Sequence, residues 1–586
     1  MGVNICLNTG VHDGSITIVE DGKILVHLLE ERFTHVKHNS PPIVALTKVK
    51  EYVDKVDKVS YTHLFPEYAD FTPYMRYFMF LSDYVSDEVN NNPIIHYNHH
   101  DLHAICGFSH SGFEDAVVVV IDGAGSTHYY GKENQTIYEV NKLGVLVREK
   151  VIVGNGYSVE DGIRNNICVA SKSIHNPAFD EKVHIPDYVR KYTNIGAGYV
   201  YSTVTELCGF GPLDCGKTMG LSAYGEDDDN IPKFINETTC GNDTFTLAVN
   251  PRSNWMGFVA AKLKKEHTTY LDKNVDNKDV IIRNLAYRVQ KDYEEYLIST
   301  CKRALELSKS KNLVLTGGCA LNCVANYKLL KSLPDDINLY VEPVSDDSGV
   351  GIGGALVVSR MGAPCKLENL YLGTKLSYSY TLQDDESEED TNPKDVAELI
   401  SKGNIVAIAQ GKSEIGPRAL GNRSILFDPR VKDGKDIVNK VKRREYFRPF
   451  AGTVLLEHAR EWFDMDRLEE SPYMMYAVDV LPEKKDLIPS IVHVDGTCRI
   501  QTVTKEQNEH YYNLISEFYK LTGVPILFNT SFNLAGDTIV ETIDDAFFTI
   551  RNSDINYMYT PEVGKLISVP NNAGVKRKSR FVKGVV

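Results

Sequence analysis

The sequence predicts an α/β protein whose first part is a two-lobed domain that grips a nucleotide between its lobes. Two apolar runs favour this fold class: 116-AVVVVID-122 and 312-NLVLTGG-318 have the length of buried strands and end in Asp-Gly or Gly-Gly. The second run leads into ALNCVANYKLL, which has helical spacing. Glycines at such ends let the backbone approach phosphates, and helix N-termini supply N–H donors.

The first sixty residues are predicted to form strands joined by tight turns. NICLNTG and GSITIVE are strand-like, and Asp21-Gly22 is a type I′ hairpin signal before KILVHLLEERF. In 345-SDDSGVGIGGALVVSR-360, four glycines punctuate the approach to a helix. These glycines are Gly349, Gly351, Gly353 and Gly354.

A second domain is predicted after residue 370. Residues 376–395 are acidic and polar, which is typical of a linker or surface loop. KDVAELISKGNIVAIAQG then begins a fresh helix-then-strand pattern. We therefore expect domains at 1–370 and 371–586, as single cores stop growing at roughly 250–300 residues.

Composition narrows the function classes. The net charge of −15 disfavours non-specific attraction to nucleic acid or anionic membranes, although a local basic groove is compatible with it. No run of 18 apolar residues is present, so we expect neither a membrane span nor a signal peptide. The 11 cysteines form no CxxC pair, which favours reduced thiols in a cytoplasmic protein. Monomer and homodimer both remain open.

The stretch 96-HYNHHDLHAICGF-108 is a candidate metal site. His99 and His103 lie at i and i+4, so on a helix they share a face. Asp122, at the end of the next strand, and Asp347 would complete a set of two nitrogens and two oxygens that suits iron(II), manganese or zinc. The other two histidines are expected to contact substrate or water. A solvated, histidine-rich turn is the alternative.

A series of different motifs follows in a recognisable order along the whole chain. The first part contains HDGSITIVEDGKI, EERFTHVKH, HHDLHA, VVVVIDGAG, GKTMGLSAYG, LTGGCALNCVAN and DDSGVGIGGA. The second contains GKSEIGPRALGNRSILFDPR, NKVKRREYFRPFAG, HVDGTCRIQTV and FNTSFNLAG. Together they resemble the O-carbamoyltransferase family of nodulation and antibiotic-biosynthesis enzymes.

This resemblance implies an N-terminal domain of the actin-like ATPase fold, similar to the metal-containing tRNA threonylcarbamoyl-transferase subunit, and a C-terminal YrdC-like domain. It implies ATP-dependent transfer of a carbamoyl group from carbamoyl phosphate, through carbamoyl-adenylate, to an acceptor hydroxyl. Adenylate formation is expected in the YrdC-like half and transfer in the metal-bearing half. The same four metal ligands match the family, with iron as the implied metal and Mg²⁺ accompanying ATP. Cys215 and the insertion-like 164–191 depart from the family pattern, which puts acceptor recognition in doubt.

Carbamoyl phosphate and ATP are polyanions, so the site needs fixed cations. We expect these from Arg418, Arg423, Lys442, Arg444 and Arg448, since arginine grips phosphate bidentately. The alternative for KVKRREYFR is a solvated helix face.

Short polar residues are expected to orient the phosphate or the carbamoyl amide, with an Asx-turn as the alternative. They are Asn529, Ser531 and Asn533.

Further candidates lie in the first part. Gly317, Gly318 and Asn322 resemble an adenosine-binding turn, with capping or packing of Asn322 within its helix as the alternative, and Lys217 is expected to reach a phosphate. His12 is the candidate base or acceptor contact, with Asp13 beside it and a hydrogen-bonded turn as the alternative. Together with Arg418 and Lys442, these two residues form the predicted catalytic set.

Two classes of acceptor compete. One is a small hydroxylated metabolite such as an aminoglycoside, macrolactam or nodulation oligosaccharide. The other is a hydroxymethylpyrimidine, such as 5-hydroxymethylcytosine, in a nucleotide or in DNA. Frequent Asn, Lys and Tyr resemble AT-rich coding, as in phage genomes, and favour the second. A duplex acceptor would have to be flipped out, and 576-KRKSR-580 is a candidate basic path. A non-enzymatic nucleotide-dependent regulator is disfavoured, because a switch has no use for a second phosphate-rich site.

Overall fold

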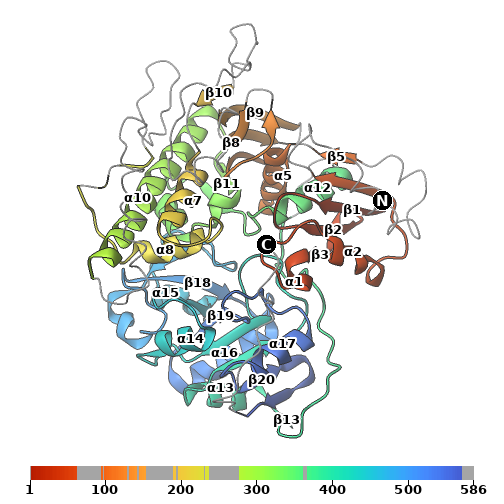
Figure 1. Cartoon of the computed structure of the whole chain (residues 1–586), viewed down its shortest axis with the longest axis vertical. Helices are drawn as coiled ribbons and strands as arrows, with labels where there is room; N and C mark the ends of the chain where they lie inside the picture. Colours follow the sequence, from red (N-terminus) through yellow and green to blue (C-terminus); the bar gives the residue numbers. More distant parts are fainter. Residues whose placement is uncertain are drawn as a thin grey trace.

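The computed structural model describes residues 2–62, 94–96, 98–128, 131–141, 144–153, 189–192, 196–229, 231, 233–235, 276–360 and 366–570. Helices and three mixed β-sheets confirm the α/β class. In Figure 1, two sheets from the N-terminal part lie side by side above the C-terminal sheet. The greater part of the insertion-like 164–191 and the basic 576–580 lie outside the described residues. Within the described ranges, no helix has the length and apolarity to cross a membrane.

The first sheet has five strands in the order β3-β2-β1-β4-β5. The strands are β1 (Val3–Asn8), β2 (Ser15–Glu20), β3 (Lys23–Leu29), β4 (Lys58–Thr62) and β5 (Ile94–His96). The predicted hairpin is confirmed, since Asp21 and Gly22 both have positive φ, at 48° and 78°, between antiparallel β2 and β3. Two short helices, α1 (Glu30–Thr34) and α2 (Ile43–Thr47), follow β3, with a 3₁₀ turn at Val49–Glu51.

The second sheet has seven strands in the order β10-β9-β8-β6-β11-β12, with β7 paired to β8. The strands are β6 (Asp115–Ile121), β7 (Thr127–His128), β8 (Gly131–Asn141), β9 (Gly144–Val153), β10 (Val189–Tyr192), β11 (Asn312–Thr316) and β12 (Asn338–Val341). Both strands predicted from apolar runs, β6 and β11, are present and pair in parallel, as do β11 and β12. The residues that follow these three strands therefore meet at one edge of the sheet.

Two helices join the two N-terminal sheets. Helix α5 (His99–Ser111) packs on β6, β8 and β11, helix α12 (Ser348–Arg360) packs on β1, β2 and β4, and the two helices pack on each other. The expectation that the four glycines precede this helix is wrong, because all four lie within α12. Their role is close packing: a Cβ on Gly353 would lie 2.1 Å from the carbonyl oxygen of Leu102 in α5.

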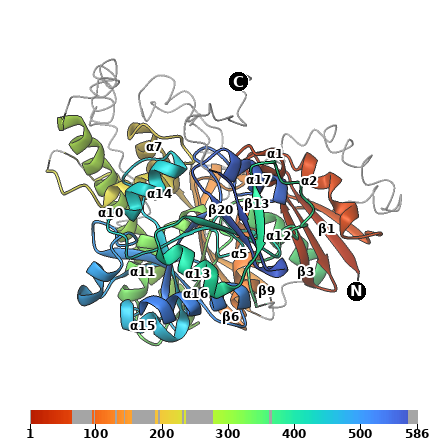
Figure 2. The ribbon, with the colours of Figure 1, turned by 90° about the horizontal axis from the view of Figure 1, so that it is seen from below.

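The remaining helices of the N-terminal part complete its second lobe. They are α7 (Ala197–Leu207), α8 (Cys215–Ser222), α10 (Asp276–Leu307), the 3₁₀ helix η4 (Gly318–Leu321) and α11 (Cys323–Ser332). In the C-terminal part the helices are α13 (Pro393–Ser401), α14 (Gly434–Lys442), α15 (Ala459–Trp462), α16 (Glu509–Thr522) and α17 (Ile543–Arg551), with 3₁₀ turns at Leu456–His458, Pro482–Leu487 and Pro561–Val563. Seen from below in Figure 2, helices α13, α14 and α16 lie in front of the second sheet, and the first sheet projects to one side.

The C-terminal sheet has nine strands in the order β13-β21-β20-β14-β15-β19-β16-β18-β17. They are β13 (Ser387–Asp390), β14 (Val406–Ala409), β15 (Arg423–Phe427), β16 (Ala451–Leu455), β17 (Ala477–Asp479), β18 (Thr497–Val503), β19 (Ile526–Ser531), β20 (Tyr557–Thr560) and β21 (Lys565–Ser568). The predicted helix-then-strand after residue 393 is confirmed as α13 and β14. The acidic segment 376–395 is largely exposed, as expected, but it also contains edge strand β13.

Candidate active site

Four metal-type ligands converge where α5 begins. The Asn98 side chain accepts a hydrogen bond from the Asp101 N–H and caps the helix, so that His99 stands in its first turn. The Nε2 atoms of His99 and His103 lie 3.1 Å apart. Asp122 follows β6, and its Oδ2 lies 3.1 Å from His99 Nε2.

The fourth ligand comes from the loop before α12. Asp347 Oδ1 lies 3.4 Å from His99 Nε2 and 3.8 Å from His103 Nε2. One ligand atom from each of the four residues falls within 4.8 Å of the others, and all four side chains are buried. The alternative of a solvated turn is therefore wrong.

The chemistry of this donor set fits a divalent metal. Two buried carboxylates face each other, and burying them requires a compensating positive charge. Burial lowers the pKa of His99, but Asp347 and Asp122 outweigh it and raise that pKa to about 10. Two imidazoles and two carboxylates suit iron(II), manganese or zinc. Metal binding and the identity of the metal remain predictions.

The other two histidines of the stretch, His96 and His100, have different surroundings. His96 lines a small hollow together with Asn8, Thr62 and His99, and its contact with substrate or water remains a prediction. The expectation that His100 contacts substrate or water is wrong: its ring is fully buried, and its Nδ1 lies 2.8 Å from Thr136 Oγ1. Burial lowers the pKa of His100 to about 3, so this ring is neutral.

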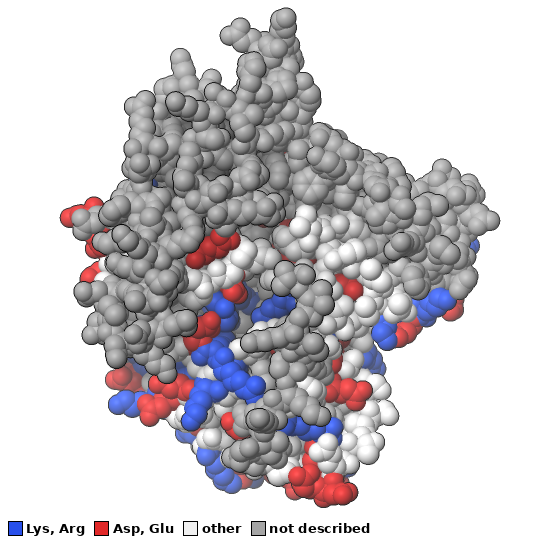
Figure 3. Space-filling model, in the orientation of Figure 1, with Lys and Arg blue, Asp and Glu red and all other residues white. Residues whose placement is uncertain are grey.

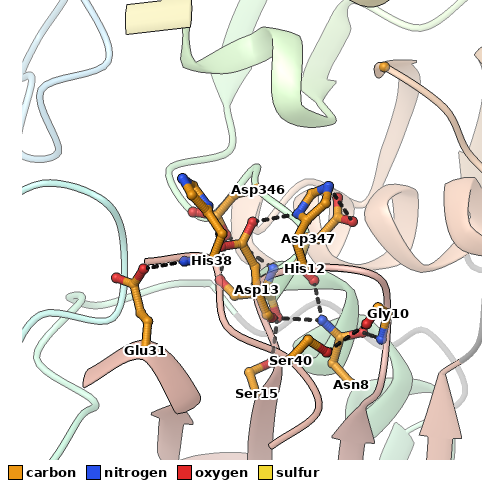
Figure 4. Close-up of polar contacts among 12 residues, drawn as sticks. Asn8, Gly10, His12, Asp13, Ser15, Glu31, His38, Ser40, Asp346 and Asp347 are labelled. Carbon is orange, nitrogen blue, oxygen red and sulfur yellow. Dashed lines mark hydrogen bonds and ion pairs between the residues drawn. The ribbon is translucent and has the colours of Figure 1, made fainter. Parts of the chain in front are cut away.

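His12 lies beside the metal-type cluster and is held by Asp13 (Figure 4). His12 Nδ1 lies 2.8 Å from Asp13 Oδ2, and its Nε2 lies 3.6 Å from Asp347 Oδ2. Burial lowers the pKa of His12, but Asp347 and Asp13 outweigh it and raise that pKa to about 9. Asp13 itself has φ of 54°, a left-handed backbone that non-glycine residues seldom adopt.

A second histidine, which the sequence did not single out, completes this chain of contacts. His38 Nδ1 lies 2.8 Å from Asp13 Oδ1, so Asp13 stands between two imidazoles. The backbone N–H of His38 donates to Glu31 Oε2 at 3.1 Å, as Figure 4 shows. The only signal in the sequence is the position of His38 at the end of the motif EERFTHVKH.

Six cations form a cluster in which each lies near others of the same sign. Burial and then the nearby Arg499 lower the pKa of Arg418 to about 9. Burial, followed by Arg444 and Arg448, lowers the pKa of Lys442 well below its ordinary value. Figure 3 shows lysine and arginine gathered near the centre of one face. This basic cluster consists of Lys37, Arg418, Lys442, Arg444, Arg448 and Arg499.

Polar groups at the end of β19 meet this cluster. Lys442 Nζ donates to Asn533 Oδ1 at 2.9 Å and to Ser531 Oγ at 3.3 Å. Asn529 lies deeper, where its Nδ2 donates to the Ala419 carbonyl at 3.2 Å and its buried Oδ1 has no partner among the described residues. Helix α14 ends at Lys442, so Arg444 and Arg448 do not belong to a solvated helix face.

Arg423 and Lys217, which the sequence also predicted to contact phosphate, have hydrogen-bond or ion-pair partners within the protein. The guanidinium of Arg423 is fully buried, and all its hydrogen bonds to described residues go to backbone carbonyls, among them those of Gln410, Asn422 and Glu541. This geometry favours a structural role for Arg423. Lys217 forms ion pairs with Asp214 at 3.0 Å and Glu445 at 3.2 Å. The two carboxylates offset the positive charge of the Lys217 ammonium group.

The glycine turn lies against the metal-type cluster. Gly317 has φ of 86°, and a Cβ there would lie 2.4 Å from the Ile121 carbonyl oxygen. A Cβ on Gly318 would lie 3.1 Å from Asp122 Oδ1. The Asn322 side chain accepts from the Ala325 N–H at 3.0 Å, which is the capping arrangement anticipated as its alternative. A nucleotide role for this turn remains a prediction.

Lys37 and Arg499 are the members of the basic cluster that the sequence did not single out. Arg499 lies on β18, and its buried Nε has no hydrogen-bond partner among the described residues. Lys37 precedes His38 in the chain, and its pKa is lowered by burial and then by Arg448. The cluster therefore reaches the His12 network.

Two family models match the chain. One is described as "Carbamoyltransferase N-terminus" and matches residues 48–356, and the other as "Carbamoyltransferase C-terminus" and matches residues 397–564.

Individual proteins agree with these matches. The nodulation protein NolNO of Sinorhizobium fredii is 30% identical over 94% of this chain and 78% of that protein. The 3′-hydroxymethylcephem-O-carbamoyltransferase of Streptomyces clavuligerus is 31% identical over 57% of this chain and 61% of that protein. Among solved structures, full-length HypF in its phosphate- and nucleotide-bound form has a TM-score of 0.36 at 12% identity, over 61% of this chain and 56% of that chain.

Proposed function

The chain belongs to the carbamoyltransferase family, and from this premise we propose that it is an ATP-dependent O-carbamoyltransferase that uses carbamoyl phosphate. The observation that carries the proposal is the proximity of two unlike sites. Lys37 belongs to the basic cluster, and its neighbour His38 belongs to the His12 network beside the metal-type ligands. A group activated among the cations has a short route to a hydroxyl held near His12.

The basic cluster is assigned to the two phosphorylated substrates. Cations that repel one another are costly to bury unless an anion compensates them, which is the situation that a polyphosphate relieves. Arg418 and Arg499 are assigned to phosphate oxygens. Lys442, Ser531 and Asn533 are assigned to the carbamoyl or phosphate group at the end of β19. There carbamoyl phosphate loses its phosphate to water, and the resulting carbamate attacks the α-phosphate of ATP to give carbamoyl-adenylate and pyrophosphate. AMP leaves when the carbamoyl group passes to the acceptor hydroxyl.

Transfer is assigned to the metal-type site. His99, His103, Asp122 and Asp347 would hold the metal, and a divalent ion supplies charge stabilisation for a carbonyl or phosphate oxygen when bound. His12 is assigned to contact the acceptor hydroxyl, and Asp13 fixes its ring through Nδ1. Asp13 is fixed in turn by His38, so the three side chains form one positioned unit.

The acceptor we propose is a primary hydroxymethyl group on a heterocycle. The Streptomyces relative is named for a hydroxymethylcephem, which supports this type of alcohol. Within this class we place 5-hydroxymethylpyrimidine, as a nucleotide or in DNA, first. A nodulation oligosaccharide or another small hydroxylated metabolite is the second candidate, which the likeness to NolNO favours.

The test is carbamoyl-phosphate- and ATP-dependent labelling of an acceptor panel, read by mass spectrometry as a gain of about 43 daltons, the mass that the carbamoyl group adds to a nucleophilic hydroxyl. The panel sets hydroxymethylcytosine nucleotide and DNA beside a hydroxymethyl heterocycle and a nodulation oligosaccharide. A gain on the nucleotide or DNA supports the first candidate, and a gain only on a small molecule supports the second. No formation of AMP with any acceptor contradicts ATP-dependent carbamoylation.

The division of labour has its own test in His103→Ala. This variant is expected to lose the metal held by the His99 set, together with carbamoyl transfer, while it retains carbamoyl-phosphate-dependent release of pyrophosphate from ATP. His100→Ala on the same helix is the matched control, because His100 faces Thr136 and not the ligand cluster. Loss of both activities in a folded His103→Ala protein contradicts the assignment of the two steps to separate sites.

A further inference from the structure

A second set of metal-type donors lies on α5, roughly two turns beyond the first. Cys106 and His110 are four residues apart, as His99 and His103 are, so they share a helical face. Glu342, directly after β12, completes the set. One ligand atom from each of these three residues lies within 4.8 Å of the other two, and all three side chains are buried.

The distances suit a single ion between the three side chains. Cys106 Sγ lies 3.7 Å from His110 Nδ1, which lies 3.1 Å from each carboxylate oxygen of Glu342. Tetrahedral zinc with bonds of about 2.3 Å to sulfur and 2.0–2.1 Å to nitrogen places neighbouring ligand atoms roughly 3.3–3.6 Å apart. The two distances that involve His110 lie within a few tenths of an ångström of these values, and Cys106 Sγ lies within 4.8 Å of the Glu342 carboxylate.

The buried carboxylate of this cluster also favours binding of a cation. Glu342 is fully buried; it accepts from the Val344 N–H at 2.9 Å, and among the described residues it has no ion pair with lysine or arginine. The ring nitrogen of His110 that faces both Cys106 and Glu342 is Nδ1. A dipositive metal bound by one thiolate and one carboxylate is neutral overall, which is the form that a buried site accommodates.

We propose that Cys106, His110 and Glu342 bind a second divalent transition metal of the zinc type, separate from the His99 set. Sulfur and imidazole ligands favour zinc over magnesium or calcium. The three side chains fill three positions of a tetrahedron, and a water molecule takes the fourth.

The role assigned to this metal is structural. Glu342 and Asp347 lie on the same short segment, which connects β12 to α12. An ion shared by α5 and Glu342 ties this segment to the helix that carries His99 and His103. It thereby fixes Asp347 relative to the other three ligands of the first site.

Cobalt(II) substitution of the whole chain tests the proposal. Of the donor sets found in the described part of the chain, only the proposed site contains a cysteine, so a thiolate-to-cobalt charge-transfer band distinguishes it from the His99 set. Wild-type protein and His103→Ala are expected to show the band, and Cys106→Ser is expected to lose it together with about one equivalent of metal by elemental analysis. Cys301→Ser is the control: Cys301 is also fully buried, but it lies on α10 outside both clusters.

Circular dichroism verifies that each variant is folded, and Glu342→Gln replaces Cys106→Ser if the latter does not fold. Absence of the band in wild-type protein overturns the proposal. So does a folded Cys106→Ser or Glu342→Gln variant with wild-type metal content and spectrum. The triad is then a hydrogen-bonded part of the core. Because metal content and the spectrum are the readouts, a failure here is distinguishable from a failure of the proposed transferase activity.

Discussion

At the scale of single residues, two arginines from motifs of the same family differ in the hydrogen-bond partners of their side chains. Arg423 donates its guanidinium N–H groups to backbone carbonyls, whereas Arg499 has a buried Nε without a partner among the described residues. A buried donor without a partner costs free energy, so Arg499 is the better candidate for contact with an anion. Both arginines lie in motifs that match the same family, and the spacing of those motifs does not show which arginine contacts an anion.

We predict that Arg499→Met lowers the apparent affinity for carbamoyl phosphate or ATP at least tenfold and changes the free energy of unfolding by less than about 1 kcal/mol, because no internal bond is lost. Arg423→Met leaves several buried carbonyls without donors and is expected to cost at least about 3 kcal/mol. Steady-state kinetics and urea denaturation check the pair. An unstable Arg499→Met with unchanged kinetics contradicts its assignment to phosphate.

Lys442 gives a prediction on pH. Burial and then Arg444 and Arg448 lower the pKa of its ammonium well below the ordinary 10.5, so the neutral amine gains population at alkaline pH. An anion beside Nζ favours the charged form, and phosphate binding is therefore expected to take up a proton and to weaken as the pH rises through the lowered pKa. Calorimetry with inorganic phosphate in buffers of different ionisation enthalpy measures this uptake.

The control for this proton uptake is Lys442→Met, which retains the aliphatic length of the side chain and removes the titrating group. The variant is expected to bind phosphate without that uptake. If the wild type and Lys442→Met take up equal numbers of protons, Lys442 is not the linked group.

At the scale of elements, α5 and α12 determine where the metal-type ligands meet. Helix α5 carries His99 and His103, and α12 begins immediately after Asp347. The glycines of α12 permit this approach, because side chains there would collide with the backbone of α5 and with the first sheet.

We predict that Gly353→Ala lowers the free energy of unfolding by roughly 1–3 kcal/mol and weakens metal binding, because the new Cβ would lie 2.1 Å from the Leu102 carbonyl oxygen. Gly216→Ala in α8 is the control, since no atom of the described residues lies within 4 Å of the position of its Cβ. It is expected to stabilise the chain by about 0.5–1 kcal/mol through helix propensity. Thermal denaturation and metal titration compare the two variants, and equal effects contradict the packing argument.

At the scale of the whole molecule, α8 contacts the C-terminal part. His493 Nε2 lies 3.0 Å from the Gly220 carbonyl oxygen, and Lys217 pairs with Glu445 at 3.2 Å. A single hydrophobic core continues from the second sheet into the C-terminal sheet. The relative position of the two parts is thereby fixed, and with it the proximity of the basic cluster to His12.

We predict that Gly220→Ala lowers overall carbamoyl transfer at least fivefold and preserves pyrophosphate release, because its Cβ would lie 2.9 Å from Pro449 Cδ and displace the two parts. Gly216→Ala on the same helix is expected to leave both rates unchanged, as its Cβ points into open space. Rates of the partial and complete reactions measure the difference. A proportional loss of both rates in Gly220→Ala contradicts a role in coupling.

The sequence by itself determined the α/β class, the hairpin at Asp21-Gly22, strands β6 and β11, and the family. These features are local or depend on ordered motifs, and residue spacing encodes both. Only the tertiary structure brought His99, His103, Asp122 and Asp347 within reach of a common ion. Only the tertiary structure distinguished the surroundings of Arg499 from those of Arg423. It also buried His100 against Thr136 and brought His38 into contact with Asp13. Which way a side chain faces depends on packing between segments far apart in the chain, and no local pattern records that.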